Sequence, residues 1–546
     1  MKKHLILLVL VCLSINKINA QTYSIILGRP TDKSITLSIL FDQNVNFYVE
    51  YGTTPGLYTK TSSTISNSAN IPNAIEINDL IFNTKFYYRL RYKSNSVSSF
   101  NASPEYFFQT QRDKGTLFSF TVEADEHLYD KKGIRSMYQI TLNNEALDQP
   151  DFMFSLGDIF GDDHYPNTIT SNDLNLLHKD YRQYLGKICH SIPFYISLGN
   201  HEGENDFYLN QNPPNNLAIW GTYWRKYYYP NPAPNSFYTG NTDIEPYGIE
   251  SPENYYAWTW GDALFVVLDV YRYENINSSK PENWDWSLGF KQYTWLRTTL
   301  EKSTAKYKFV FAHHIRGQGR GALTNAKLFE WGGYEADGKT YGFDKNRPGW
   351  GKPIHQVFKD NGVNIFFQGH DHLFAHEILD GIHYQEVPMP SDSTYMIGKL
   401  ANADAYTSDT LDGTGHIRVN VSSSCVKVDY VKAYLPKDTL DGKHKNREIG
   451  FSYNIGTCLV TGIEDIQNQS LTDLIKIFPN PVRNFLNLSF NEPTLKFECK
   501  LIDEIGNVVL ISNQKQIDIG YLPNGIYILS IQTDKWNKNQ KILINK

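Results

Sequence analysis

Side chains of the kinds that bind divalent metal ions follow five separate apolar runs in this sequence of 546 residues. Carboxylate, imidazole and amide groups supply the oxygen and nitrogen ligands of such ions. The carboxyl ends of strands in an α/β sheet meet at one crevice, so segments far apart in the chain can share a site. The five segments are Asp125-Glu126-His127 after LFSFTVE, Gly157-Asp158 after FMFSL, Gly199-Asn200-His201-Glu202 after PFYISL, His313-His314 after KFVFA, and Gly369-His370-Asp371-His372 after NIFFQ.

Each of these segments, taken singly, is also typical of a turn, because Asp and other small polar residues at a strand end often do no more than satisfy the local backbone. The Gly-His-Asp-His run is rarer. A chain with 37 Gly and 15 His contains a Gly-His-x-His run by chance only about 0.03 times. Five such segments, all at strand ends, together predict one metal-dependent reaction centre.

The elements that would position these residues alternate between short apolar strands and longer segments of helical period. Helices are predicted over 171–188 and 290–303, and this alternation indicates an α/β core. Alternating runs at 417–422 and 426–434 predict a mixed sheet beside it. The Trp- and Tyr-rich stretch 220–286 is interpreted as an insertion that its own aromatic side chains pack. The core domain is predicted to span residues 113–465.

Two β-rich segments flank this core. Residues 21–112 alternate apolar and polar residues as a small β-sandwich would, and residues 80–88 resemble a strand entrance of fibronectin type III domains, although Phe86 stands where that family usually has a tyrosine. Residues 466–546 form a second strand series, predicted to be another β-sandwich. Its phrases KIFPNPVRNFLNLSF, KLIDEIGNVVL and YLPNGIYILSIQ resemble the type IX secretion sorting domain of Bacteroidota.

The N-terminus and the charge of the chain limit its location and partners. Residues 1–20 have the lysines, apolar run and final small residue of a secretory signal peptide. No later apolar run approaches the ~20 residues of a membrane-spanning helix, so the mature chain is expected to lack one and to be secreted or held at the cell surface. A net charge of -6 gives no basic footprint for a nucleic-acid partner. The four remaining cysteines form no CxxC motif, which leaves disulfide pairing open.

The ordered set D-x-H, GD, GNHE, VxxH and GHxH resembles the calcineurin-like metallophosphoesterases, and the preceding sandwich makes the purple acid phosphatases the nearest relatives. The resemblance implies an α/β metallophosphoesterase core with two metal ions that share Asp158. Asp125, His127 and His372 would complete the first ligand set, and Asn200, His313 and His370 the second. His201 would face the substrate. Because adjacent side chains of an extended segment point opposite ways, His314 is the alternative to His313, and the VxxH register favours His313.

The implied reaction is hydrolysis of a phosphate monoester by a hydroxide that bridges the two ions, with Asp158 and His201 as catalytic residues and His201 assisting the leaving oxygen. Purple enzymes have a metal-binding tyrosine three residues after the bridging aspartate, where this chain has Gly161. Zn, Mn or ferrous iron therefore become more plausible than ferric iron, and the ligand set does not choose among them. Arg316, Arg320 and His314 are candidate substrate-binding residues, and a solvent-exposed loop is the alternative interpretation of 315–321.

The sequence thus predicts an exported dinuclear-metal phosphatase, with a phosphorylated small molecule or polymer and the type IX secretion machinery as partners. Phosphodiester hydrolysis is the alternative within the same chemistry, because the five segments define the reaction centre but not what reaches it. A hypothesis of another class is a cell-surface glycan-binding or adhesion protein, since two β-sandwiches flank the core and aromatic residues make up 14% of the chain. A pure binding protein has no need of seven metal ligands, which disfavours that hypothesis.

Overall fold

The structure is a computed structural model that describes residues 23–160, 167–273, 283–315, 320–458, 475–490, 496–503, 508–533 and 537–546. The chain divides into two compact units, residues 1–457 and residues 458–546. The predicted signal peptide lies outside the described residues. Among the described residues, no helix is long and apolar enough to span a membrane.

The N-terminal part of the first unit consists of two β-sheets that enclose a common apolar core. Strand β3 (Val45–Gly52) alternates between buried and half-buried residues along most of its length, as a strand with one face on a core does. The predicted β-sandwich is therefore present, and its kinship with fibronectin type III domains stays a prediction. One sheet has the order β1 (Tyr23–Gly28), β2 (Ile35–Phe41), β6 (Asn73–Ile77), and the other contains β3, β4 (Lys60–Thr61), β5 (Ile65–Asn67), β7 (Lys85–Ser94), β8 (Asn101–Ala102) and β9 (Tyr106–Gln109).

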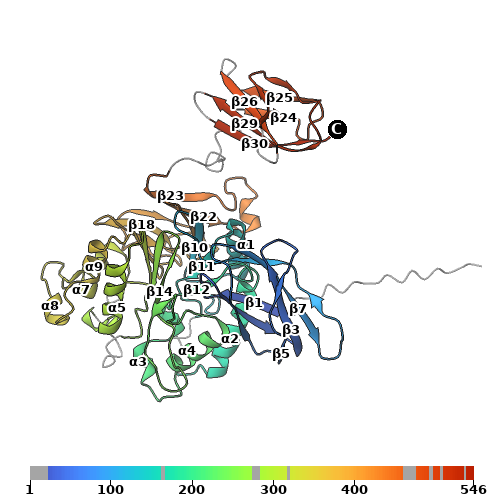
Figure 1. The fold of residues 1–546 in the computed structure, drawn as a ribbon. Helices are drawn as coiled ribbons and strands as arrows, with labels where there is room; N and C mark the ends of the chain where they lie inside the picture. The colour runs from blue at the N-terminus through green and yellow to red at the C-terminus, as the bar shows by residue number, and fades with distance from the viewer. Residues whose placement is uncertain are drawn as a thin grey trace, which may run out of the picture. The chain divides into compact units, whose positions relative to one another are not determined.

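The core domain is built on two larger sheets whose inner faces share one aromatic-rich core. Strands far apart in sequence lie side by side, because the first strand of the domain pairs on one side with a strand some 300 residues later (Figure 1). The six-stranded sheet has the order β12 (Phe194–Ile196), β11 (Phe152–Ser155), β10 (Phe118–Glu123), β21 (Thr414–Val421), β22 (Cys425–Ala433), β23 (Ile449–Gly456). The eight-stranded sheet has the order β13 (Thr239–Gly240), β14 (Tyr256–Trp260), β15 (Ala263–Val267), β16 (Tyr307–Phe311), β17 (Ile365–Gln368), β19 (Ile382–Glu386), β18 (Phe374–Leu379), β20 (Asp409–Leu411).

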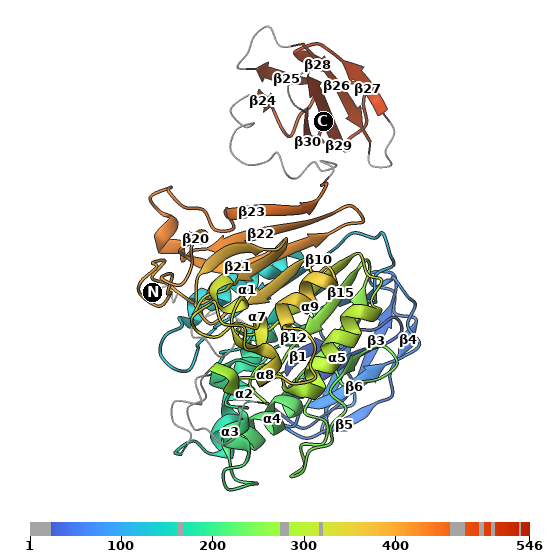
Figure 2. The ribbon, with the colours of Figure 1, turned by 90° about the vertical axis from the view of Figure 1, so that its left-hand side faces the viewer.

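Helices cover the outer faces of both sheets, which confirms the predicted α/β core of mixed sheets flanked by helices (Figure 2). Helices α1 (Arg135–Asp148), α2 (Ser171–Leu185) and α4 (Leu217–Tyr228) accompany the six-stranded sheet, and α5 (Gly289–Lys302) and α9 (Ile354–Asp360) pack on the eight-stranded one. Helix α2 begins at a capping box in which Thr170 and Asp173 bond each other's backbone N–H groups. Short helices lie in the connections, namely α3 (Asp206–Leu209), α6 (Leu323–Ala326), α7 (Phe329–Gly332) and α8 (Phe343–Asn346).

The interpretation of 220–286 as a separate insertion is wrong in its second half. Residues 256–260 form β14, which pairs with β15 in the eight-stranded sheet. Tyr256, Trp258 and Trp260 are buried in the core between the two sheets. The aromatic residues of this stretch therefore stabilise the main core instead of packing an appended segment.

The second unit is β-rich, as predicted, and consists of two small sheets around one apolar core. Strand β29 (Gly525–Thr533) is its longest and pairs on both sides. The remaining strands are β24 (Ile475–Phe478), β25 (Phe485–Phe490) and β28 (Gln516–Asp518) in one sheet, and β26 (Phe497–Ile502), β27 (Val508–Ser512) and β30 (Asn537–Ile544) in the sheet of β29. Among the described residues, Cys189 and Cys499 are free thiols.

Candidate metal centre

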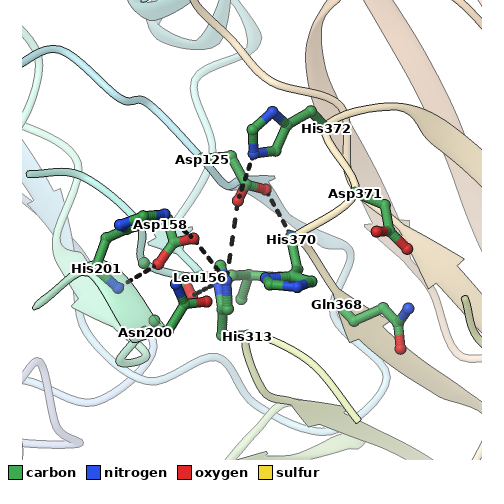
Figure 3. A network of polar contacts seen from close by, with 12 residues as sticks. Asp125, Leu156, Asp158, Asn200, His201, His313, Gln368, His370, Asp371 and His372 are labelled. Carbon is green, nitrogen blue, oxygen red and sulfur yellow. Dashed lines mark hydrogen bonds and ion pairs between the residues drawn. The ribbon is translucent and has the colours of Figure 1, made fainter. Parts of the chain in front are cut away.

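The predicted metal-binding residues lie where five strands end. Strands β10, β11 and β12 run parallel in one sheet, and β16 and β17 run parallel in the other. Each is followed within four residues by one of the five segments. In Figure 3 the labelled candidate ligands from these segments point toward one another. The two-sheet architecture thus brings residues from 125 to 372 into one buried cluster.

The backbone turns sharply at most of these residues. Five of them have positive φ angles, a conformation that costs a residue other than glycine about 1–3 kcal/mol and that clusters at functional sites. Backbone hydrogen bonds brace the first turn, since Asp125 N–H donates to the Gly157 carbonyl at 2.9 Å and His127 N–H donates to the Asp158 carbonyl at 3.1 Å. The five are Asp125 (63°), His127 (43°), Asp158 (63°), His370 (82°) and His372 (63°).

Two glycines of the motifs are required by the closeness of these turns. A Cβ at position 369 would lie 2.6 Å from the Asp125 carboxylate, and one at position 199 would collide with the Asp158 carboxylate. No real Cβ atom fits at such distances, so only glycine lets the two segments approach the aspartates. The Gly in GNHE and in GHDH is therefore explained by steric fit to the neighbouring ligand residue.

The first group of potential ligands is formed by Asp125, His127 and His372. One oxygen or nitrogen atom of each lies within 4.8 Å of the others. The Nε2 atoms of His127 and His372 are 3.0 Å apart, and His372 Nε2 lies 3.6 Å from Asp125 Oδ1. Burial lowers the pKa of both histidines, which favours the neutral, metal-binding form.

The second group is formed by Asp158, His313 and His370. His313 Nε2 lies 3.0 Å from Asp158 Oδ2, while its Nδ1 donates to the Leu156 carbonyl at 3.0 Å and so orients the ring. Burial alone would lower the pKa of His313, but the carboxylates of Asp158 and Asp125 outweigh it and raise the pKa to about 9. The same negative charges would favour a divalent cation between these side chains.

The remaining predicted residues lie beside the second group. Asn200 begins a short 3₁₀ segment (Asn200–Glu202), and its amide oxygen accepts from the Tyr271 hydroxyl at 3.4 Å. His201 donates its backbone N–H to Asp158 Oδ1 at 2.8 Å, and its Nε2 lies 3.7 Å from Asp158 Oδ2. The His201 side chain is 11% exposed, whereas those of His127 and His313 are 0% exposed. His201 therefore reaches the solvent-facing side of the cluster.

Two of the three candidate substrate-binding residues are described by the structure, and both lie outside the two groups of potential ligands. His314 is buried, with its ring centroid 4.5 Å from that of His370. Arg320 is 40% exposed and donates from Nη1 to Asp371 Oδ1 at 2.9 Å. Arg316 and Gly161 lie outside the described residues.

Two carboxylates to which the sequence analysis gave no role hold the candidate ligands in place. Asp130 Oδ2 accepts from His127 Nδ1 at 2.7 Å, which leaves Nε2 as the nitrogen that faces the cluster. Glu202 accepts backbone N–H groups of Asp158, Ile159 and Gly199 at 2.7–2.9 Å and so ties two of the five segments together. Neither role has a sequence signal, because both depend on contacts that only the folded chain makes.

The residues fit one or more divalent ions. Asp125 Oδ1 is buried and accepts no hydrogen bond from the described residues. A buried carboxylate oxygen without a partner is unfavourable, and a cation among these nitrogen and oxygen atoms would satisfy it.

Comparisons with known proteins agree with this arrangement. Residues 119–374 match the family model of calcineurin-like phosphoesterases, and residues 476–545 match that of the secretion system C-terminal sorting domain. The solved structure of PhoD has a TM-score of 0.55 at 17% identity, covering 79% of this chain and 90% of that one. The purple acid phosphatase PPD1 from yellow lupin (Lupinus luteus) seeds has a TM-score of 0.52 at 14% identity, covering 79% and 74%. No curated protein matches this sequence significantly.

At these identities the similarity to the two solved structures shows a shared fold only. The two family models assign residues 119–374 and 476–545 to their families. The C-terminal match also marks the chain for export by type IX secretion. The chain therefore carries a calcineurin-like phosphoesterase domain over residues 119–374, followed by a C-terminal type IX secretion sorting domain.

Proposed function

We propose that this protein is an exported phosphatase that hydrolyses phosphate monoesters with the help of two divalent metal ions. The observation that carries the proposal is the position of Asp158. Its carboxylate lies within 4.8 Å of ligand atoms from His313 and His370 and, in a separate group, of ligand atoms from His127 and His201. A carboxylate shared between two ligand groups is suited to bridging two ions.

The charge of the site supports an anionic substrate. Two carboxylates, four neutral imidazoles and one amide carry about -2, so two divalent ions would leave a net charge of about +2. When bound there, the ions would act as Lewis acids toward the phosphoryl group and lower the pKa of a water molecule to near neutrality. Asp125, His127, Asp158, Asn200, His313, His370 and His372 would hold them.

The side chains of this chain have further roles in the proposed reaction. His201 lies at the exposed side of the cluster and is placed to donate a proton to the leaving alcohol. Its Nε2 would carry that proton while the Asp158 carboxylate, 3.7 Å away, stabilises the protonated ring. Arg320 adds a positive charge at the rim, next to the His370 carbonyl, and would favour the dianionic phosphate of a monoester over the single charge of a diester.

The experiment that tests this proposal compares a chromogenic phosphomonoester with the matching diester. The secreted protein is stripped of metal and resupplied separately with Zn, Mn, Fe(II) or Mg. Turnover should return with metal, favour the monoester, and be lost in the Asn200→Ala variant. A preference for the diester would make the protein a phosphodiesterase. Bound metal without turnover of either ester would contradict the proposal and lead to glycan-binding assays.

A further inference from the structure

The aspartate between the two histidines of the Gly369–His372 segment faces away from the candidate metal centre (Figure 3). Asp371 is fully buried, and three donors from distant parts of the chain contact its carboxylate. Gly321 N–H donates to Oδ2 at 2.8 Å, the Tyr406 hydroxyl donates to Oδ2 at 2.7 Å, and Arg320 Nη1 donates to Oδ1 at 2.9 Å. This carboxylate therefore joins three segments behind the histidines.

A second buried carboxyl group completes the cluster. Glu386, on β19, accepts the backbone N–H of Asp371 at 3.0 Å, and its Oε2 lies 2.9 Å from the Tyr406 hydroxyl. Tyr406 has one proton and can donate to only one of the two carboxyl groups. The Tyr406 hydroxyl therefore lies between the two carboxyl groups and ties Glu386 to the carboxylate that contacts Arg320.

The backbone on both sides of Asp371 needs such support. His370 has φ of 82° and His372 has φ of 63°, so the two potential ligands stand in left-handed conformations around one residue. Conformations of this kind persist only where several contacts with the surrounding structure hold the backbone in place. The contacts of Asp371 and of its backbone N–H hold the turn from the side opposite the metal centre.

The same carboxylate orients Arg320. That side chain is 40% exposed, and its Nη1 atom also lies 3.3 Å from the His370 carbonyl. In the part of the chain that the structure describes, its Nε and Nη2 atoms make no hydrogen bond or ion pair. A guanidinium fixed through Nη1, with its Nε–Nη2 edge available, is preorganised to bind two oxygens of a phosphate.

We propose that Asp371 is a positioning residue with two separable effects: it holds His370 and His372 for metal binding, and it holds Arg320 for binding of the substrate phosphate. This inference rests on the proposed function for its second effect only. The first effect concerns metal retention and holds whatever the metal-loaded protein hydrolyses.

The test measures two affinities of the full mature chain, that for Zn²⁺ by competition with a chromophoric chelator and that of the Zn-loaded protein for inorganic phosphate by calorimetry. Asp371→Asn should weaken Zn²⁺ binding about 10- to 100-fold, as loss of a group that orients metal-binding histidines does. Arg320→Ala should leave Zn²⁺ affinity within about twofold of wild type and weaken phosphate binding about 10- to 100-fold. The double variant should bind phosphate no more weakly than Arg320→Ala alone.

Two further variants keep the test decisive. Tyr406→Phe removes the contacts of the hydroxyl with Asp371 and Glu386 without a change of charge. It should weaken both affinities in the same direction as Asp371→Asn, even if the latter folds poorly. Asp404→Asn removes a charge from an exposed side chain near Tyr406 in sequence and should change neither affinity. Wild-type Zn²⁺ affinity in folded Asp371→Asn, or equal Zn²⁺ loss in Arg320→Ala, would overturn the inference. If Asp371→Asn binds Zn²⁺ more weakly as expected but the wild-type protein binds no phosphate, the role of Asp371 in metal binding is supported and the proposed function is contradicted.

Discussion

Asp130 offers a direct test of whether the cluster binds metal through the histidine orientation seen here. The His127 Nδ1 to Asp130 Oδ2 distance is 2.7 Å, and the two side chains are 0% and 8% exposed. Burial opposes ionisation of Asp130, but its contacts with His127 hold its pKa well below the ordinary value. This is a buried hydrogen bond with a charged acceptor, which contributes about 1.5–3 kcal/mol.

Replacing Asp130 by asparagine keeps an oxygen that can accept from Nδ1 but removes the charge, whereas alanine leaves a buried N–H without an acceptor. A loss of about 1.5–3 kcal/mol corresponds to roughly a 10- to 100-fold weaker metal affinity, since each 1.4 kcal/mol is a factor of ten. The expected order of Zn²⁺ affinity is wild type, then Asp130→Asn, then Asp130→Ala. Asp42→Asn, an exposed carboxylate of the N-terminal sandwich, is the control and should match wild type.

The assay is a titration of the metal-free protein with Zn²⁺ against a chromophoric chelator, with thermal unfolding as the check on folding. His127 belongs to the group with Asp125 and His372. The binding of one equivalent of Zn²⁺ should therefore become weaker, and the binding of the other should stay nearly unchanged. The reasoning is refuted if folded Asp130→Ala binds both equivalents as tightly as wild type, or if it loses both to the same extent.

Three other predictions use different parts of the molecule. His201→Ala should lower kcat for a phosphomonoester about 10²- to 10⁴-fold with unchanged Zn²⁺ affinity, and a loss of Zn²⁺ would instead make His201 a ligand. Asp148, against His416, Arg418 and Arg447, is held at a pKa of about 2 because these contacts outweigh burial. The pKa of Asp148 in the folded protein lies below its unfolded value, so its ionised form should add about 2 kcal/mol to the free energy of unfolding above pH 4 and lose this as the pH falls toward 2. Urea unfolding of wild type and Asp148→Asn across that range should show the difference between their unfolding free energies decreasing. Arg182→Met removes a buried cation of α2 that bonds Ser24 and Ser38 of the N-terminal sandwich, and should lower the unfolding free energy by about 3 kcal/mol. An unchanged urea midpoint would show that this contact does not stabilise the unit.

The sequence could predict the strands of the core because each is a short apolar run that two packed sheets bury completely. The five predicted runs correspond to β10, β11, β12, β16 and β17, and the two predicted helices to α2 and α5 within a few residues. Helix α1 was not foreseen, because its buried face includes Thr141, Asn144 and Glu145 and thus hides the apolar period of a helix. Strand β14 was misassigned because tryptophan and tyrosine indicate burial without indicating which core they fill.

For the candidate metal centre too, the sequence predicts what depends on neighbouring residues and misses what depends on contacts between distant segments. Side chains at strand ends can be recognised from the sequence, since their chemistry and their position are both local properties. The groups behind them cannot, because Glu202 acts on the backbone of residues 158 and 159, and Tyr406 and Glu386 act on Asp371. No periodicity or spacing links those partners before the sheets come together.

The backbone conformation of the candidate ligands explains why these supporting carboxylates are needed. Each strand runs out of the space between two sheets, and the chain must turn at once for the next side chain to face the common centre. Glycine makes such turns at least cost but offers no ligand atom. The chain instead places Asp125, Asp158 and His372 at positive φ and offsets the conformational cost with hydrogen bonds from behind. Residues such as Asp130, Glu202 and Asp371 are therefore part of the proposed metal centre in energetic terms, although none of them needs to touch an ion.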